Sequence, residues 1–191
     1  NLILNSSFPC LTDEEVKKTI LSICSSQIKQ GSMVGSFQNH ENNLESCTPF
    51  YPIITAHRVI EALSIYSNTY NDVYDEILNT ISLCVIFLKS SHEFEKPVSY
   101  ENAMGVDNKE LLRGIGHIVQ ALTKANSFDK YLEKKVNYLI DFQSKNGAFV
   151  GRSDYFNANR ELTNSTDLTA FIIRTLSIYV SELHNINEIQ H

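Results

Sequence analysis

The spacing of apolar residues along this chain predicts helices throughout. In the segment 53–66 they recur every three or four positions, as one helix face requires: Ile53, Ala56, Val59, Ile60, Leu63 and Tyr66. The same spacing recurs at 16–28, 73–88, 109–125, in a segment that ends at Gln143, and at 168–180. No stretch shows the sustained alternation of apolar and polar residues that is typical of a strand. The pattern therefore predicts an all-α fold with six helices and no sheet.

Capping and breaker residues set the predicted ends of these helices. Thr12, followed three residues later by Glu15, forms a capping box at the start of the first helix, which we expect to end before Gly31. Residues rich in Gly, Asn and Pro then mark loops between the helices of each pair, at 31–52, 90–107 and 150–166. The second helices of the three pairs are accordingly expected to start near Ile53, Lys109 and Leu168.

The six helices form one domain, 1–191, of three helix–loop–helix units, at about 12–70, 71–126 and 127–184. The ends of the second helices align at Leu63, Leu122 and Leu176, in steps of 59 and 54 residues. The outer two units share the tetrapeptide Leu-Ser-Ile-Tyr, and both carry a Gly closely followed by a Phe at the head of the loop. Since a two-helix unit cannot bury its apolar face alone, we expect the units to stack.

Two glycines interrupt the predicted helix 109–125. Gly114 and Gly116 each cost about 1 kcal/mol relative to Ala inside a helix. Small residues at such positions permit a second helix to cross closely, so we expect a close helix contact there.

Composition and charge narrow the classes of function. The chain is 42% hydrophobic and 20% charged with a net charge of −6, which is ordinary for a soluble globular protein and excludes a basic nucleic-acid surface. No apolar run is long enough to span a bilayer, and no signal-peptide pattern is visible. Four scattered cysteines favour a reducing cytoplasm. The first residue is Asn rather than Met, which leaves a trimmed chain or a fragment open.

The segment 143–149, Gln-Ser-Lys-Asn-Gly-Ala-Phe, resembles the Gln-x-x-Asp-Gly-Ser-Trp repeat of terpenoid cyclases and protein prenyltransferases. Asn146 stands for the Asp, Ala148 for the Ser and Phe149 for the Trp, and 27–37 is a looser copy. In such a motif the Gln can hydrogen-bond loop backbone, the Gly permits a tight turn, and the aromatic ring fills the space between stacked units. The Thr-Ala pair at 169–170 resembles the start of the helix that follows the motif.

The resemblance implies an α/α toroid, in which the first helix of each unit is outer and the second is inner, around an apolar cavity. It also implies a lipophilic or natural-product substrate in that cavity. Six helices make about half of a full ring, so we expect a half ring or compact crescent. The family's catalytic motifs are missing: the chain has no Asp-x-Asp-Asp, no Asp-Asp-x-x-Asp and no Asp-x-Cys zinc motif. No metal or cofactor is predicted.

Polar and aromatic residues before and within the inner helices supply the candidate site, because they would gather at one mouth of the cavity. A carboxylate and a His facing an apolar pocket could act as acid and base, since desolvation raises the pKa of a carboxylate. The candidate catalytic residues are His57, Asp167, Glu161 and Glu45. The candidate substrate-binding residues are Phe50, Tyr51, Arg160, Tyr155 and Phe171.

Simpler roles compete with each candidate. Asp167 can cap its helix, the two glutamates can be solvated loop residues, and the aromatic rings can pack in the core. His57 with Cys47 could form a nucleophile–base pair or contribute two metal ligands, but a core thiol and a satisfied imidazole explain them as well. His117 lies within one position of His57 in the repeat, which suggests a shared place on the inner helices. Four arginines could bind an acidic group or pair locally: Arg58, Arg113, Arg160 and Arg174.

Two functions follow from these observations. The first is a cyclase- or transferase-like enzyme of natural-product biosynthesis that acts on or binds a lipophilic molecule. The second is a non-catalytic helical module that binds a peptide or protein partner. Because the helix 168–180 is apolar on more than one side, we also expect a homodimer or association with the rest of a larger toroid. The competing explanation is that the apolar segment 2–8 folds over one end of the stack as a cap.

Overall fold

The computed structural model describes residues 11–37, 51–90, 108–143, 145–151, 163–164 and 166–189, and this part of the chain is all-α. Its six α-helices are α1 (Asp13–Ser26), α2 (Tyr51–Tyr66), α3 (Tyr74–Ser90), α4 (Asn108–Lys124), α5 (Lys130–Asp141) and α6 (Thr166–Ile189). A short 3-10 helix, η1 (Asn71–Val73), leads into α3. The predicted fold class is confirmed, and the second helices of the three pairs start within two residues of the predicted positions.

A small antiparallel ribbon lies between α5 and α6 and was not predicted. Strand β1 (Val150–Gly151) pairs with β2 (Thr163–Asn164), so that Val150 faces Asn164 and Gly151 faces Thr163. Strands of two residues are too short to show an alternating pattern, which is why the sequence carried no signal for them.

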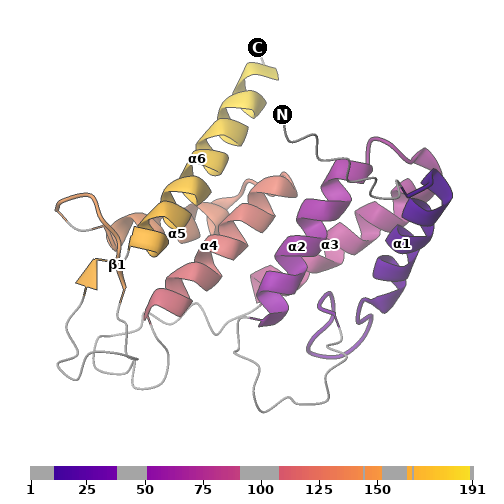
Figure 1. Cartoon of the computed structure of the whole chain (residues 1–191), viewed down its shortest axis with the longest axis horizontal. Coiled ribbons are helices and arrows are strands. Elements are labelled where there is room, and N and C mark those ends of the chain that lie inside the picture. Colours follow the sequence, from indigo (N-terminus) through magenta and orange to yellow (C-terminus); the bar gives the residue numbers. More distant parts are fainter. Residues whose placement is uncertain are drawn as a thin grey trace, which may run out of the picture.

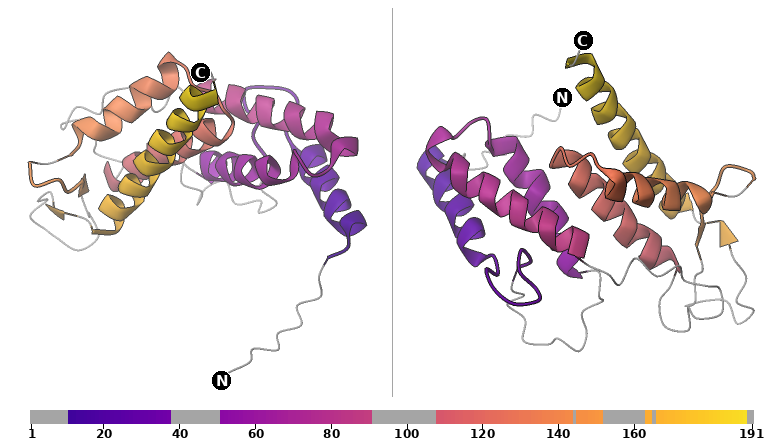
Figure 2. Two further views of the ribbon diagram at one scale, coloured as in Figure 1. Left: turned by 90° about the horizontal axis from the view of Figure 1, so that it is seen from above. Right: turned by 180° about the vertical axis from the view of Figure 1, so that it is seen from behind.

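The helices are arranged in two layers (Figures 1 and 2). Helices α2, α4 and α6 lie side by side in one layer, with α4 in contact with both of the others. Helices α3 and α5 lie behind this layer, where α3 packs on α2 and α5 packs on α4, while α1 packs on α3 at one end. The second helices of the three predicted pairs, α2, α4 and α6, therefore share one layer, and they are called the inner helices from here on. Closure into a toroid stays a prediction.

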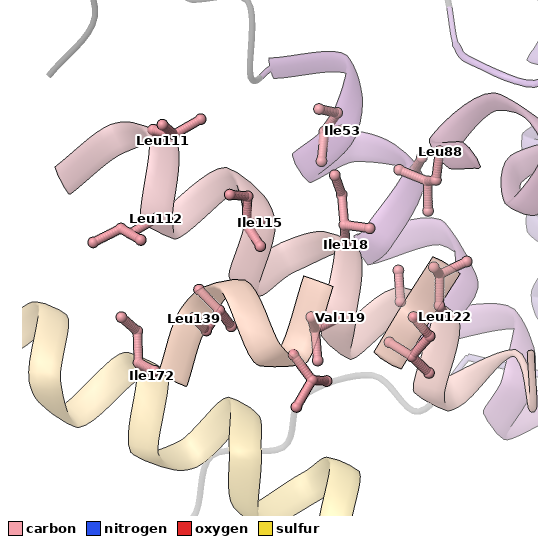
Figure 3. Packing of buried hydrophobic residues seen from close by; sticks show 14 of the residues in the cluster. Ile53, Leu88, Leu111, Leu112, Ile115, Ile118, Val119, Leu122, Leu139 and Ile172 are labelled. Carbon is pink, nitrogen blue, oxygen red and sulfur yellow. The ribbon is translucent and has the colours of Figure 1, made fainter. Parts of the chain in front are cut away.

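Helix α4 is the centre of the core. Five of its aliphatic residues have no exposed surface: Leu112, Ile115, Ile118, Val119 and Leu122. Figure 3 shows them beside buried side chains from four other helices, namely Ile53, Leu88, Leu139 and Ile172. Burying one such side chain stabilises the fold by about 1.5–3 kcal/mol, so α4 holds the two layers together.

Helix α1 is held by a smaller apolar cluster and a well-formed N-terminus. Ile20 and Cys24 are buried against side chains of α2, η1 and α3. The predicted capping box is confirmed, because Thr12 Oγ1 accepts from the backbone of Glu15 and the Glu15 carboxylate accepts from the backbone of Thr12. Lys17 also pairs with Asp72 at 2.6 Å, which joins α1 to η1.

The predicted turn motif is present after α5. The Gln143 side chain donates to the carbonyl of Gly147 at 2.9 Å, and the backbones of Gln143 and Phe149 form an antiparallel bridge. Gly147 has a φ of +83°, which glycine adopts without strain. Phe149 is 1% exposed, and its backbone N–H donates to Thr169 Oγ1 at the start of α6. The motif therefore sets how the chain turns from α5 toward α6.

The looser copy after α1 folds in the same way. The Gln27 side chain donates to the carbonyl of Gly35 at 3.1 Å, and a bridge joins Gln27 to Phe37. Gly35 has a φ of +88°. The same Gln27 amide also donates to the carbonyl of Thr80 at 3.0 Å and to Cys84 Sγ at 3.3 Å, so this turn is fastened to α3. Shared hydrogen bonds in the two loops confirm that they are copies of one local structure.

Replacing Gly35 with Ala should destabilise the protein more than replacing Gly31, which has almost the same φ of +87°. A Cβ at Gly35 would lie 2.0 Å from the carbonyl oxygen of Leu83 on α3, whereas a Cβ at Gly31 meets nothing within 4 Å. G31A should cost only the left-handed backbone penalty of about 1–2 kcal/mol, and G35A about 2 kcal/mol more. Urea unfolding of both variants measures the difference, and equal losses would contradict the close packing of this turn on α3.

Candidate functional site

A cavity of about 410 Å³ lies among the three inner helices. Its lining residues come from α2, α4 and α6: Ile54, His57, Arg58, Glu61, Arg113, Gly114, His117, Gln120, Phe171 and Arg174. Residues from three separate units of the sequence therefore share one site. The resemblance implied a cavity in this layer, but the lining is more polar than the apolar cavity that was expected.

Two histidines meet at this cavity. Nδ1 of His57 on α2 lies 2.9 Å from Nδ1 of His117 on α4, and the His57 residue is only 2% exposed. The Phe171 ring of α6 packs on His117 with 5.0 Å between ring centroids. One imidazole must donate its Nδ1–H and the other must accept at Nδ1, so the two rings adopt different tautomers.

Both histidines are neutral at pH 7. Burial lowers the pKa of His57 to about 4, and Arg58 and Arg174 oppose its positive charge while Glu61 favours it. Burial likewise lowers the pKa of His117 to about 4, with further lowering by His57, Arg58 and Arg113. The ring whose Nδ1 donates keeps a basic Nε2, and the ring whose Nδ1 accepts carries an Nε2–H. The pair therefore combines one proton acceptor and one proton donor.

One arginine from each inner helix lines the cavity. Arg58 pairs with Glu61 at 3.0 Å one turn along α2. Arg113 on α4 pairs with Asp167 in the first turn of α6. Arg174 makes no hydrogen bond or ion pair with the described part of the chain, although its charge acts on His57. Arg174 is thus the guanidinium best placed to meet a ligand.

Close packing of α4 on α6 fixes the aromatic wall of the cavity. A Cβ at Gly116 would lie 2.4 Å from Phe171 Cε1, so only Gly leaves room for that ring. Beside it, Gln120 Nε2 donates to Thr175 Oγ1 at 2.6 Å, and Thr175 Oγ1 donates to the Phe171 carbonyl at 2.9 Å. The close helix contact predicted from the two glycines of α4 is confirmed at Gly116.

The structure places three of the candidate site residues by their side chains. His57 and Phe171 line the cavity, while Asp167 is exposed and reaches the site only through Arg113. Tyr51 is the first residue of α2, and its side chain lies outside the described residues. Also outside them are Glu45, Phe50, Tyr155, Arg160 and Glu161, together with Cys47. Their predicted roles stay predictions.

Sequence reasoning left several lining residues out of the candidate site. His117 was related to His57 through the repeat, and the arginines at 58, 113 and 174 were weighed as a set that could bind an acidic group, but none of them was a predicted site residue. Glu61, Gln120 and Ile54 were not considered. The signal that could have found His117 was its place one position from His57 in the repeat, because equivalent positions on neighbouring inner helices lie side by side.

Metal binding finds no support in the described residues, where no group of three or more His, Cys, Asp or Glu side chains is suited to hold an ion. The two described cysteines, Cys24 and Cys84, are free and buried, and burial raises the pKa of the Cys84 thiol to about 12. These two thiols are therefore core residues rather than nucleophiles.

Comparison with protein-family models, with curated proteins and with solved structures finds no match for this chain. Among the described residues, no helix has the length and apolar character needed to cross a lipid bilayer.

The buried histidines should make folding stability depend on pH between about 4 and 6.5. Their folded-state pKa values lie below the ordinary value of 6.5, so the unfolded chain binds more protons in this window and stability falls as the pH falls. The amides of the H57N/H117N variant can still hydrogen-bond but do not titrate. Between pH 7 and pH 5 we expect the free energy of unfolding to fall by about 1–3 kcal/mol less in this variant than in the wild type. Urea unfolding at both pH values measures this.

H184Q is the matched control, because His184 is exposed and, within the described residues, its side chain pairs with Glu188 near the end of α6. H184Q should keep the wild-type loss of stability on acidification. The same loss in H57N/H117N as in the wild type would contradict a buried neutral pair.

Proposed function

We propose that the cavity among α2, α4 and α6 binds a small organic molecule with an apolar body and that the protein acts on it by proton transfer. The observation that carries this proposal is the neutral His57–His117 pair in a cavity of about 410 Å³. Ligand pockets of globular proteins typically measure about 300–1,000 Å³ and combine apolar walls with a few convergent polar groups.

The apolar body of the ligand would lie against Ile54 and Phe171. The histidine pair would then be within reach of the ligand's reactive part, with one Nε2 ready to accept a proton and the other ready to donate one. The hydrogen bond between the Nδ1 atoms holds both tautomers in place, as an orienting partner does in other acid–base sites. The resemblance to terpenoid cyclases and prenyltransferases supports a lipophilic or natural-product substrate.

A second candidate function, a helical module that binds a protein partner, is favoured by an apolar groove on α6. The groove has a volume of about 490 Å³ and is lined by Gln143, Phe149, Ile173, Leu176, Ser177, Val180 and Ser181. Its Ile173 is 52% exposed, although the equivalent repeat residues Ile60 and Val119 are fully buried. In the earlier units this position is buried within the stack, so the groove fits the inner helix of a second copy.

Filling the cavity should weaken ligand binding, and filling the groove should leave it intact. The neutral dye N-phenyl-1-naphthylamine, which fluoresces in apolar sites, should bind the wild type saturably. I54W places a bulky ring in the cavity and should weaken binding by about tenfold or more, which corresponds to about 1.4 kcal/mol. The matched control I173W places the same ring in the groove and should bind normally.

Absence of saturable dye binding in the wild type would contradict the proposed function. Weaker binding in I173W than in I54W would assign the dye to the groove instead. Because the chain has no Trp of its own, the fluorescence of each introduced indole also reports directly whether the dye lies beside it.

The groove predicts self-association that depends on its apolar residues. Sedimentation at micromolar concentration should show a dimer of the 21.7 kDa chain, and the I173D/V180D variant should be monomeric because the charges would be buried at the interface. The I65D variant is the control, since Ile65 is 67% exposed on α2 and outside the groove. A monomeric wild type would contradict closure by a second copy.

A further inference from the structure

The charges around the histidine pair are unbalanced, although the whole chain is acidic. Three guanidinium groups and one carboxylate of the described residues line the cavity, and a second carboxylate pairs with one of these guanidinium groups. The lining groups are Arg58 and Glu61 on α2, Arg113 on α4 and Arg174 on α6, and Asp167 on α6 pairs with Arg113. With both histidines neutral, these five side chains of the described part of the chain together carry one positive charge in excess, whereas the net charge of the chain is −6. This excess matches one monovalent anion.

We propose that the site binds the carboxylate of an apolar organic acid at Arg174, and that binding is coupled to the uptake of one proton shared between His57 and His117. This inference rests on the proposed function and adds the chemical class of the ligand and its link to pH. A guanidinium presents two parallel N–H groups that match the two oxygens of a carboxylate. The apolar chain of the acid would occupy the wall formed by Ile54 and Phe171.

The geometry of the pair suits a shared proton. The two Nδ1 atoms are 2.9 Å apart, so a proton added to the basic Nε2 of the donating ring turns the pair into an imidazolium beside an imidazole. A hydrogen bond with one charged partner is shorter and stronger than a neutral one. No bond is broken in this step, and the proton comes from solvent.

A bound anion would favour protonation of the histidine pair by adding a negative charge beside it. Burial and the nearby arginines lower the pKa of each ring to about 4. Both rings are therefore neutral at pH 7 in the free protein. A carboxylate at Arg174 would offset the positive charge that opposes protonation, and it would add a negative charge close to the pair. Proton and anion then favour each other's binding by the same factor, because linkage between two sites is reciprocal.

Isothermal titration with octanoate tests the proposal, with octan-1-ol as the neutral ligand of equal chain length and octane-1-sulfonate as an anion that does not titrate. Measurement at pH 6 in two buffers of different ionisation enthalpy gives the number of protons taken up. We expect about one proton for each bound octanoate or sulfonate and none for octan-1-ol. The affinity for both anions should rise as the pH falls from 7.5 to 5.5.

Three variants separate the parts of the proposal. R174Q should weaken octanoate binding by about tenfold or more and leave octan-1-ol binding unchanged. K134Q removes the same charge at an exposed position of α5 and should bind octanoate as the wild type does. H57N/H117N should bind octanoate without proton uptake. Circular dichroism of each variant establishes that it is folded before its binding is compared.

Several results would overturn the proposal while the proposed function stands. Octan-1-ol that binds as tightly as octanoate would exclude an anion subsite. Equal octanoate binding by R174Q and K134Q would exclude Arg174, and equal proton uptake by H57N/H117N and the wild type would exclude the histidine pair. Failure of all three ligands and of the neutral naphthylamine dye to bind would instead contradict the proposed function itself.

Discussion

The burial of α4 between α2 and α6 is the constraint on which the rest of this structure depends. Its apolar residues contact side chains from both layers, and among the described helices no other joins so many parts of the core. Such a helix needs small residues where a neighbour comes close, and Gly116 is the position where the Phe171 ring approaches α4. The cost of glycine in a helix is offset here by the packing that it permits.

The candidate site is a direct consequence of that arrangement. Bringing α2, α4 and α6 side by side places one polar edge of each helix on a common cavity. Burial there suppresses the charge of His57 and His117, so the packing that stabilises the layer also sets the protonation state of the site. Stability and chemistry are therefore coupled through the same two side chains, which is why both are expected to respond to pH.

Part of the site could be predicted from sequence, because position in the repeat carries spatial information. His57 and Phe171 were expected to face an inner cavity, and they do. The repeat suggested a shared place for His57 and His117, but the 2.9 Å contact between their Nδ1 atoms could not be predicted, since a single-residue slip in the repeat and the relative shift of two helices decide which side chains meet. Arg113 and Asp167 belong to different units and pair only because α4 and α6 are adjacent.

Local information in the sequence determined the helices, their starts, the capping box at Thr12 and the two Gln–Gly–Phe turns. These features depend on residues within a few positions of one another, whose hydrogen bonds and backbone preferences act before any helices pack. Only the tertiary structure decided which polar groups share the cavity and that its histidines are neutral. Those properties arise from contacts between residues about 55–60 positions apart and from burial by several helices at once. Patterns within a few residues of one another do not predict such contacts or such burial.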